Sequence, residues 1–138
     1  MYRFSVKAIV LGMLAMFALD LLSGVVSFMV FGGDALQPGA TQEQIQAVAE
    51  SARQNNGYLL STLVLGTLTT ILGGYITARL AQQLPLFNAG ALGVVALGTL
   101  FVLGSPGETP WWLDLFGAVS TIPAAIFGGV LGRRARHG

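Results

Sequence analysis

Polar side chains within long apolar segments are the residues of this sequence with the clearest potential for chemistry. The foremost is Asp20, because it lies beside the midpoint of the apolar run 8–31. If that run crosses a membrane, the acid lies at the bilayer centre, where an aspartate costs about 2.5 to 3.5 kcal/mol on insertion scales. We therefore expect Asp20 to face other helices and either to find a partner there or to stay protonated.

Hydroxyl side chains are expected at the same depth in two further helices, which together predict a polar layer at mid-membrane. In the last helix, Pro123 disrupts the backbone ladder and leaves the carbonyl of Val119 as a further acceptor. No basic residue lies at this depth to pair with Asp20. The hydroxyl residues at this depth are Thr67, Thr69, Thr70, Ser120 and Thr121. The predicted mid-membrane polar site comprises Asp20, Thr70, Ser120 and Thr121.

Two interpretations of this polar layer remain open. In the functional one, Asp20 is the centre of a proton- or ion-responsive site, or of a polar pocket for a small ligand. In the structural one, a protonated Asp20 hydrogen-bonds a threonine or the carbonyl of Val119 and so fastens the bundle, as hydroxyl residues in membrane helices commonly do.

The sequence argues against an enzyme. Its single histidine, His137, is the penultimate residue, and cysteine is absent. A serine–histidine–aspartate relay and a histidine or thiolate metal site are therefore not expected. Asp20 has no second acid at its depth with which to form a catalytic pair of carboxylates. We expect no catalytic residue, no metal and no cofactor.

The elements that must position the polar layer follow from composition. Charged residues make up 9% of the 138 positions and hydrophobic residues 54%, a balance that cannot build a water-soluble surface. The apolar runs are each about long enough for a helix to cross the hydrocarbon core, and they lack the alternation of barrel strands. They span residues 8–31, 58–78, 84–104 and 111–132. The predicted fold is all-α: a single four-transmembrane-helix domain over residues 1–138.

The distribution of basic residues predicts the orientation of this bundle. Arg53 is the one basic residue outside the two tails and the connection between the second and third runs; the others are Arg3, Lys7, Arg79, Arg133, Arg134 and Arg136. By the positive-inside rule, both termini are expected on the cytoplasmic side of a cell inner membrane. The first run could also be a signal peptide, with Arg3 and Lys7 as its charged end. We consider this the weaker interpretation, because the run is 24 residues long and the sequence begins at Met1.

The outer loop 32–57 contains the one long polar stretch, "TQEQIQAVAESARQNNG". Thr41 and Gln44 have the spacing of a capping box, and Gly57 is a candidate stop signal. Ile45 and Val48 fall on one helical face, with two alanines beside them. The stretch therefore predicts a short amphipathic helix lying against the outer leaflet or the helix ends.

Small residues predict where the helices approach each other. They recur at four-residue spacing, so Gly66 and Gly74, and likewise Gly117 and Gly129, are the predicted helix-packing residues.

Two of the helix ends match each other in sequence. "ILGGYITAR" at 71–79 matches "IFGGVLGRR" at 126–134 at Ile71, Gly73, Gly74 and Arg79. One interpretation is two tandem hairpins related by an axis along the membrane normal. The other is chance, in a glycine-rich chain that ends its helices on arginine.

The stretch "GGYITARLA", the short proline-containing turn, the tryptophan-led last helix and the arginine tail also carry a resemblance. Over residues 58–136 the chain resembles small, uncharacterised four-helix integral membrane proteins of bacteria. The resemblance implies a fold and a bacterial inner membrane, and it implies no function.

The sequence thus favours a non-enzymatic inner-membrane protein that acts as an accessory or self-associating subunit. Its expected partners are membrane lipids and a second copy or a larger membrane complex, with no nucleic acid. The alternative is a small transporter or channel with its polar site at Asp20.

The topology can be tested with introduced cysteines, since the chain has none of its own. A cysteine in place of Gln46 and one appended to the C-terminus should react with an impermeant thiol reagent from opposite sides of the membrane. Labelling of both from the same side would contradict the predicted orientation.

Overall fold

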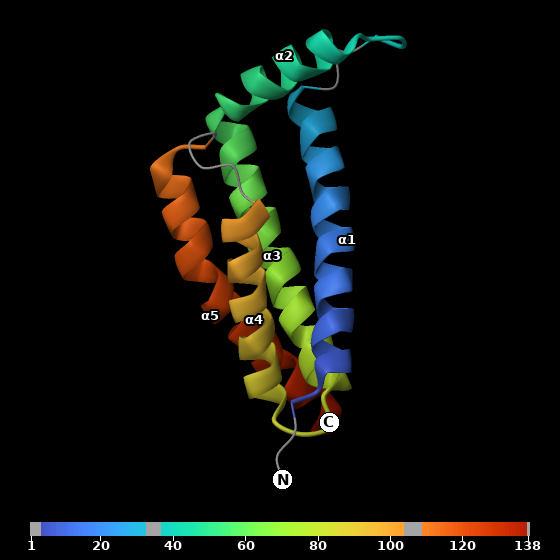
Figure 1. The fold of residues 1–138 in the computed structure, drawn as a ribbon, viewed down its shortest axis with the longest axis vertical. Helices are drawn as coiled ribbons and strands as arrows, with labels where there is room; N and C mark the ends of the chain where they lie inside the picture. Colours follow the sequence, from blue (N-terminus) through green and yellow to red (C-terminus); the bar gives the residue numbers. More distant parts are fainter. Residues whose placement is uncertain (1–3, 33–36, 104–108, 138) are drawn as a thin grey trace.

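The computed structural model describes residues 4–32, 37–103 and 109–137, and within these ranges it contains helices and no strand (Figure 1). The helices are α1 (Val6–Phe31), α2 (Gln42–Arg53), α3 (Asn56–Leu80), α4 (Pro85–Leu103) and α5 (Trp111–His137). All but α2 are long and apolar enough to cross a membrane. The predicted all-α bundle of four membrane-spanning helices with a short amphipathic helix is therefore confirmed.

The short helix α2 lies across one end of the bundle, and both termini lie at the other (Figure 1). We call these the α2 end and the terminal end. The chain therefore runs toward the terminal end in α3 and α5 and toward the α2 end in α1 and α4. The apolar face of α2 lies over the end of α1, where a Cβ on Gly32 would lie 2.9 Å from Cγ1 of Val48.

Side-chain caps define the starts of α2 and α3. At the start of α2, Thr41 Oγ1 accepts from the backbone N–H of Gln44 at 3.3 Å, and Gln44 Oε1 accepts from that of Thr41 at 2.9 Å. The stop expected at Gly57 is wrong, because α2 ends at Arg53 and Gly57 belongs to the first turn of α3. Asn55 Oδ1 caps that turn by accepting from the N–H of Gly57 at 2.8 Å.

The tightest packing in the bundle lies between α3 and α5 near the terminal end. A Cβ on Gly74 would collide with the backbone of Ala125, and one on Gly128 would collide with the backbone of Ile71. Ile71, Gly74 and Gly128 belong to the two stretches that match in sequence, and Ala125 directly precedes the second, so the matching stretches pack against each other. Bare backbone at both positions lets the helix axes approach closely, as small residues do in membrane bundles.

The other helices join the same close-packed half. A Cβ on Gly12 of α1 would collide with the side chain of Thr77, and one on Gly129 of α5 would lie 2.6 Å from Cβ of Ala89 in α4. Leu92 of α4 is fully buried at this level and clusters with Met16 of α1. All four membrane helices therefore meet in the terminal half.

Two of the four predicted packing glycines make no such contact. Gly74 and Gly129 lie at helix contacts, but a Cβ on Gly66 or Gly117 would meet no heavy atom within 4 Å. Helix contact at Gly66 and Gly117 is thus wrong, because these residues lie nearer the α2 end, where the helices diverge. Gly12 and Gly128, which were outside the predicted set, make close contacts instead.

The packing departs from the two-fold relation that tandem hairpins would have. Each hairpin pairs its own helices, α1 with α3 and α4 with α5. However, α4 also packs on α3, whereas α1 has no comparable contact with α5. The bundle is consequently asymmetric, with α3 in contact with every other helix.

A buried amide ties the start of α1 to the turn between α3 and α4. The side chain of Asn88 is fully buried, and its Oδ1 accepts from the backbone N–H of Ser5 at 2.8 Å. Its Nδ2 donates to the carbonyls of Gln83 and Leu84, each at 2.9 Å. All its hydrogen-bonding atoms are therefore satisfied inside the protein, which burial of an amide requires.

The α3–α5 contact can be tested with the smallest possible side chain. Gly74→Ala should destabilise the protein by about 1 to 3 kcal/mol, because the added Cβ meets backbone atoms that cannot rotate aside. The loss should appear as a lower thermal midpoint in detergent.

Gly66→Ala is the matched control, since it makes the same chemical change in the same helix where the added Cβ meets nothing within 4 Å. Its thermal midpoint should equal or exceed that of the wild type. Equal midpoints for the two variants would show that α3 and α5 do not pack as described.

Candidate functional site

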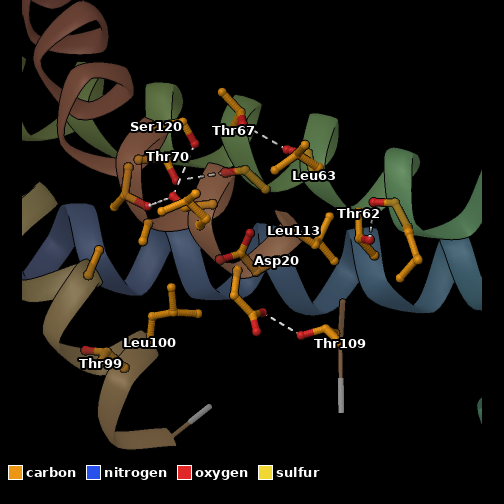
Figure 2. Close-up of a pocket in the computed structure, with 18 of the residues that line it drawn as sticks. Asp20, Thr62, Leu63, Thr67, Thr70, Thr99, Leu100, Thr109, Leu113 and Ser120 are labelled. Carbon is orange, nitrogen blue, oxygen red and sulfur yellow. Dashed lines mark hydrogen bonds between the residues drawn. The ribbon is translucent and has the colours of Figure 1, made fainter. Parts of the chain in front are cut away.

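A cavity of about 1000 Å³ lies between the membrane helices in the half of the bundle toward the α2 end (Figure 2). All four membrane helices contribute to its walls. Arg53, Trp111 and Asp114 line it near the α2 end and are exposed, so the cavity opens there. Its polar lining comprises Asp20, Arg53, Tyr58, Thr62, Thr67, Thr70, Thr99, Thr109, Asp114, Ser120 and Thr121.

The predicted polar residues all border this one cavity. Asp20 comes from α1, Thr70 from α3, and Ser120 and Thr121 from α5. Figure 2 shows Asp20 at the centre of the view, with labelled hydroxyl residues from the other helices around it. Residues that are far apart in the sequence are thus brought together at mid-bundle, at the depth expected from the apolar runs.

The direct partner of Asp20 is Thr69, which was not in the predicted site. Thr69 Oγ1 donates to Asp20 Oδ1 and also lies 2.9 Å from the carbonyl oxygen of Gly66. Its single hydroxyl hydrogen can serve only one of these acceptors at a time. A protonated Asp20 would instead donate to Thr69 and leave that hydrogen to Gly66, so the geometry accommodates both charge states of the acid.

Asp20 makes no other hydrogen bond within the described residues. Thr70, Ser120 and Thr121 share the cavity with it but bond to their own helices. Of the two expected fastening partners of Asp20, a threonine and the carbonyl of Val119, the structure contains the threonine. The second carboxylate oxygen has no hydrogen-bond partner among the described residues.

Six of the serine and threonine hydroxyls that line the cavity share one pattern of bonding: each donates its hydrogen to a backbone carbonyl one turn earlier in its own helix. The bonds are Thr62 to Leu59 at 2.8 Å, Thr67 to Leu63 at 2.8 Å, Thr70 to Gly66 at 2.8 Å, Thr99 to Val95 at 2.9 Å, Ser120 to Gly117 at 3.2 Å and Thr121 to Gly117 at 2.6 Å. Thr109 near the α2 end differs, because its Oγ1 donates to Oδ1 of Asp114. A hydroxyl whose hydrogen is engaged offers only its oxygen lone pairs. The polar walls therefore consist mainly of acceptors.

Glycine at positions 66 and 117 helps to make this space. Both line the cavity, and neither touches another helix. Side chains there would extend into the cavity, so these glycines keep it open. The four-residue spacing by which Gly66 is predicted to pack against another helix also includes Thr62 and Thr70, and these three residues form one wall of the cavity.

A smaller cavity of about 200 Å³ adjoins Asp20 between α1 and α3. Its lining includes Ser23, Gly24 and Ser27 from α1. Ser27 is 3% exposed, and its hydroxyl has no hydrogen-bond partner within the described residues. Because buried hydroxyls in proteins are nearly always bonded, this group is available to a molecule in the smaller cavity.

Sequence reasoning missed the residues nearer the α2 end, such as Tyr58, Thr62 and Thr99. They lie outside the mid-membrane layer, and only the divergence of the helices shows that they share a cavity with it. Within the described ranges, no group of three or more histidine, cysteine, aspartate or glutamate side chains gathers that could hold a metal ion.

Comparison with family models, with curated proteins and with solved structures found no match to this chain. The resemblance to small bacterial membrane proteins therefore rests on the quoted motifs alone. The site must be interpreted from its geometry.

Proposed function

We propose that this protein is a non-enzymatic component of a membrane transport system that binds a small ligand in the cavity around Asp20. The observation that supports this proposal is the cavity itself. Its volume of about 1000 Å³ is at the upper end of the range typical of small-molecule sites. It also brings a membrane-embedded acid together with hydroxyl oxygens from α3, α4 and α5.

A purely structural role for Asp20 accounts for less of this arrangement. The hydrogen bond between Thr69 and Asp20 needs only two helices, whereas the cavity draws polar side chains from all four. Acids inside membrane segments are costly and most often serve ligands, ions or protons. A fastener alone gives no reason for glycine at positions 66 and 117, where larger side chains would find space.

The orientation of the cavity follows from the charge pattern. The α2 end carries no basic residue of the described chain except Arg53, whereas Lys7, Arg79 and Arg133 lie toward the terminal end. By the positive-inside rule, we place the α2 end on the outer side of a bacterial inner membrane. The ligand would then enter from outside, and the close-packed terminal half would bar its passage to the cytoplasm.

An accessory or self-associating subunit is the second candidate. Gly98 in α4 is exposed, and a Cβ there would meet no heavy atom of the described residues within 4 Å. A small residue on such a surface suits contact with a helix of another chain. This alternative would leave the cavity without a role.

Access to the cavity from water distinguishes the two candidates. In Ser120→Cys, the thiol replaces a hydroxyl of nearly the same shape that lines the cavity at mid-membrane. A small, neutral, water-soluble thiol reagent added on the α2 side of vesicles should modify it, as measured by intact-protein mass.

Val119→Cys is the matched control, because Val119 is the neighbouring residue at the same depth, is 64% exposed and does not line the cavity. Its thiol should face lipid and react much more slowly. If Ser120→Cys is as unreactive as this control, lipid or protein fills the cavity and the ligand-binding proposal fails.

A further inference from the structure

We infer that, if the cavity serves the proposed function, its ligand is a protonated amine with a compact apolar body. Three features of the walls carry this inference: the direction of their hydrogen bonds, the sign and position of their charges, and the distribution of their apolar side chains. This names a ligand class for the same cavity and thus rests on the proposed function.

Hydrogen-bond direction favours a ligand that donates. The hydroxyls of Thr70, Ser120 and Thr121 give their hydrogens to their own helices, as do those of Thr62, Thr67 and Thr99. At mid-bundle these hydroxyls leave their oxygen lone pairs toward the cavity, while the donor side chains of the lining, Arg53, Tyr58 and Trp111, lie near the α2 end. A ligand built from acceptors, such as a carboxylate or a carbonyl compound, would find few partners at mid-bundle, whereas an ammonium group brings three donors.

The charged side chains of the lining also favour a cationic ligand. Asp20 is the acid at the inner end of the cavity, and the described lining contains no lysine and only one arginine, Arg53, at the α2 end. An anion that reached mid-bundle would face a carboxyl group without a nearby base. A cation would pair with the carboxylate oxygen of Asp20 that has no partner among the described residues, in a charge-assisted hydrogen bond.

The remaining walls call for an apolar body on this cation. Phe17, Leu63, Ala96 and Leu100 line the cavity around the polar groups. A bare metal cation needs several oxygen ligands within about 2.6 Å, which acceptors spread around so large a space would not supply. An amine with an apolar group of a few carbons to one ring can reach Asp20 with its head and cover the apolar wall with its body.

Aromatic side chains near the opening suit the same ligand class. Tyr58 and Trp111 line the cavity near the α2 end, where a cation entering from water would first meet them. Aromatic faces attract cations through their ring quadrupoles without demanding full loss of hydration. They would also hold the apolar body once the ammonium group has moved inward.

A matched ligand series tests the inference on purified full-length protein in lipid nanodiscs. The probes are 2-phenylethylammonium, its neutral isostere 2-phenylethanol and the anion 3-phenylpropanoate, with binding followed by calorimetry. The ammonium should bind at least about tenfold more tightly than the alcohol, the effect of one charge-assisted hydrogen bond. The propanoate should bind most weakly.

Two substitutions test whether Asp20 is the residue that makes the ammonium bind more tightly than the alcohol. Asp20→Asn keeps the shape of the side chain and should remove the advantage of the ammonium over the alcohol. Glu50→Gln removes one negative charge from the exposed face of α2, outside the cavity, and should leave that advantage unchanged. If Asp20→Asn does not fold, Asp20→Glu, which retains the charge, and the wild-type series still decide the question.

The outcomes separate this inference from the proposed function. Equal binding of ammonium and alcohol to the wild type, tighter binding of the propanoate, or an ammonium preference that survives in folded Asp20→Asn would each overturn the inference. Cavity access at Ser120→Cys would then still support a ligand-binding function. If no probe binds and Ser120→Cys is unreactive, both proposals fail together.

Discussion

The contact between the backbones of α3 and α5 at the terminal end is the constraint on which the rest of the bundle depends. Helices in lipid gain no hydrophobic energy from association, so dispersion at short range must hold them together. Gly74 against Ala125 and Gly128 against Ile71 provide that short range. Toward the α2 end the helices diverge, and a Cβ on Gly66 or Gly117 would meet nothing within 4 Å. The close-packed half therefore holds the bundle together, and the cavity lies in the half where the helices separate.

The bonding of the hydroxyl groups reflects the membrane environment. A hydroxyl among lipid-embedded helices finds its own backbone carbonyl one turn away without any tertiary contact, and Thr67, Thr70 and Thr121 all do so. This local choice sets the character of the cavity at mid-bundle, since these hydroxyls offer it only their acceptor lone pairs. Thr69 and Thr77 differ, because the hydroxyl of Thr69 bonds Asp20 and that of Thr77 lies 3.4 Å from the carbonyl oxygen of Ala8, so that both join α3 to α1. Local bonding thus shapes the cavity, and one long-range bond positions its acid.

The sequence predicted the membrane helices and the depth of Asp20 because both depend on length and composition along one chain. It could not predict which face of each helix meets which neighbour. Thr69 and Thr70 differ by one residue, or about 100° around the helix, and only the rotation of α3 decides which bonds Asp20. The same uncertainty misassigned Gly66, which has the spacing of a packing residue but faces the cavity. Asn88 gave no periodic signal at all, because its bonds join a tail, a turn and a helix start.

The close-packed terminal half consists of backbone contacts between helices, and this limits how a ligand could pass through it. A gate made of large side chains opens when those side chains change rotamer, but Gly74, Gly128 and Gly132 have none to move. Their neighbours are backbone atoms of the facing helix. Opening this end would therefore require displacement of whole helices, as in rigid-body or shear motions between packed elements. Pro123 lies in α5 between the cavity-lining Thr121 and the close-packed Ala125, where its interruption of the backbone ladder makes the helix easiest to bend. Passage through the bundle would accordingly couple a movement of α5 below Pro123 to release of the contact with α3.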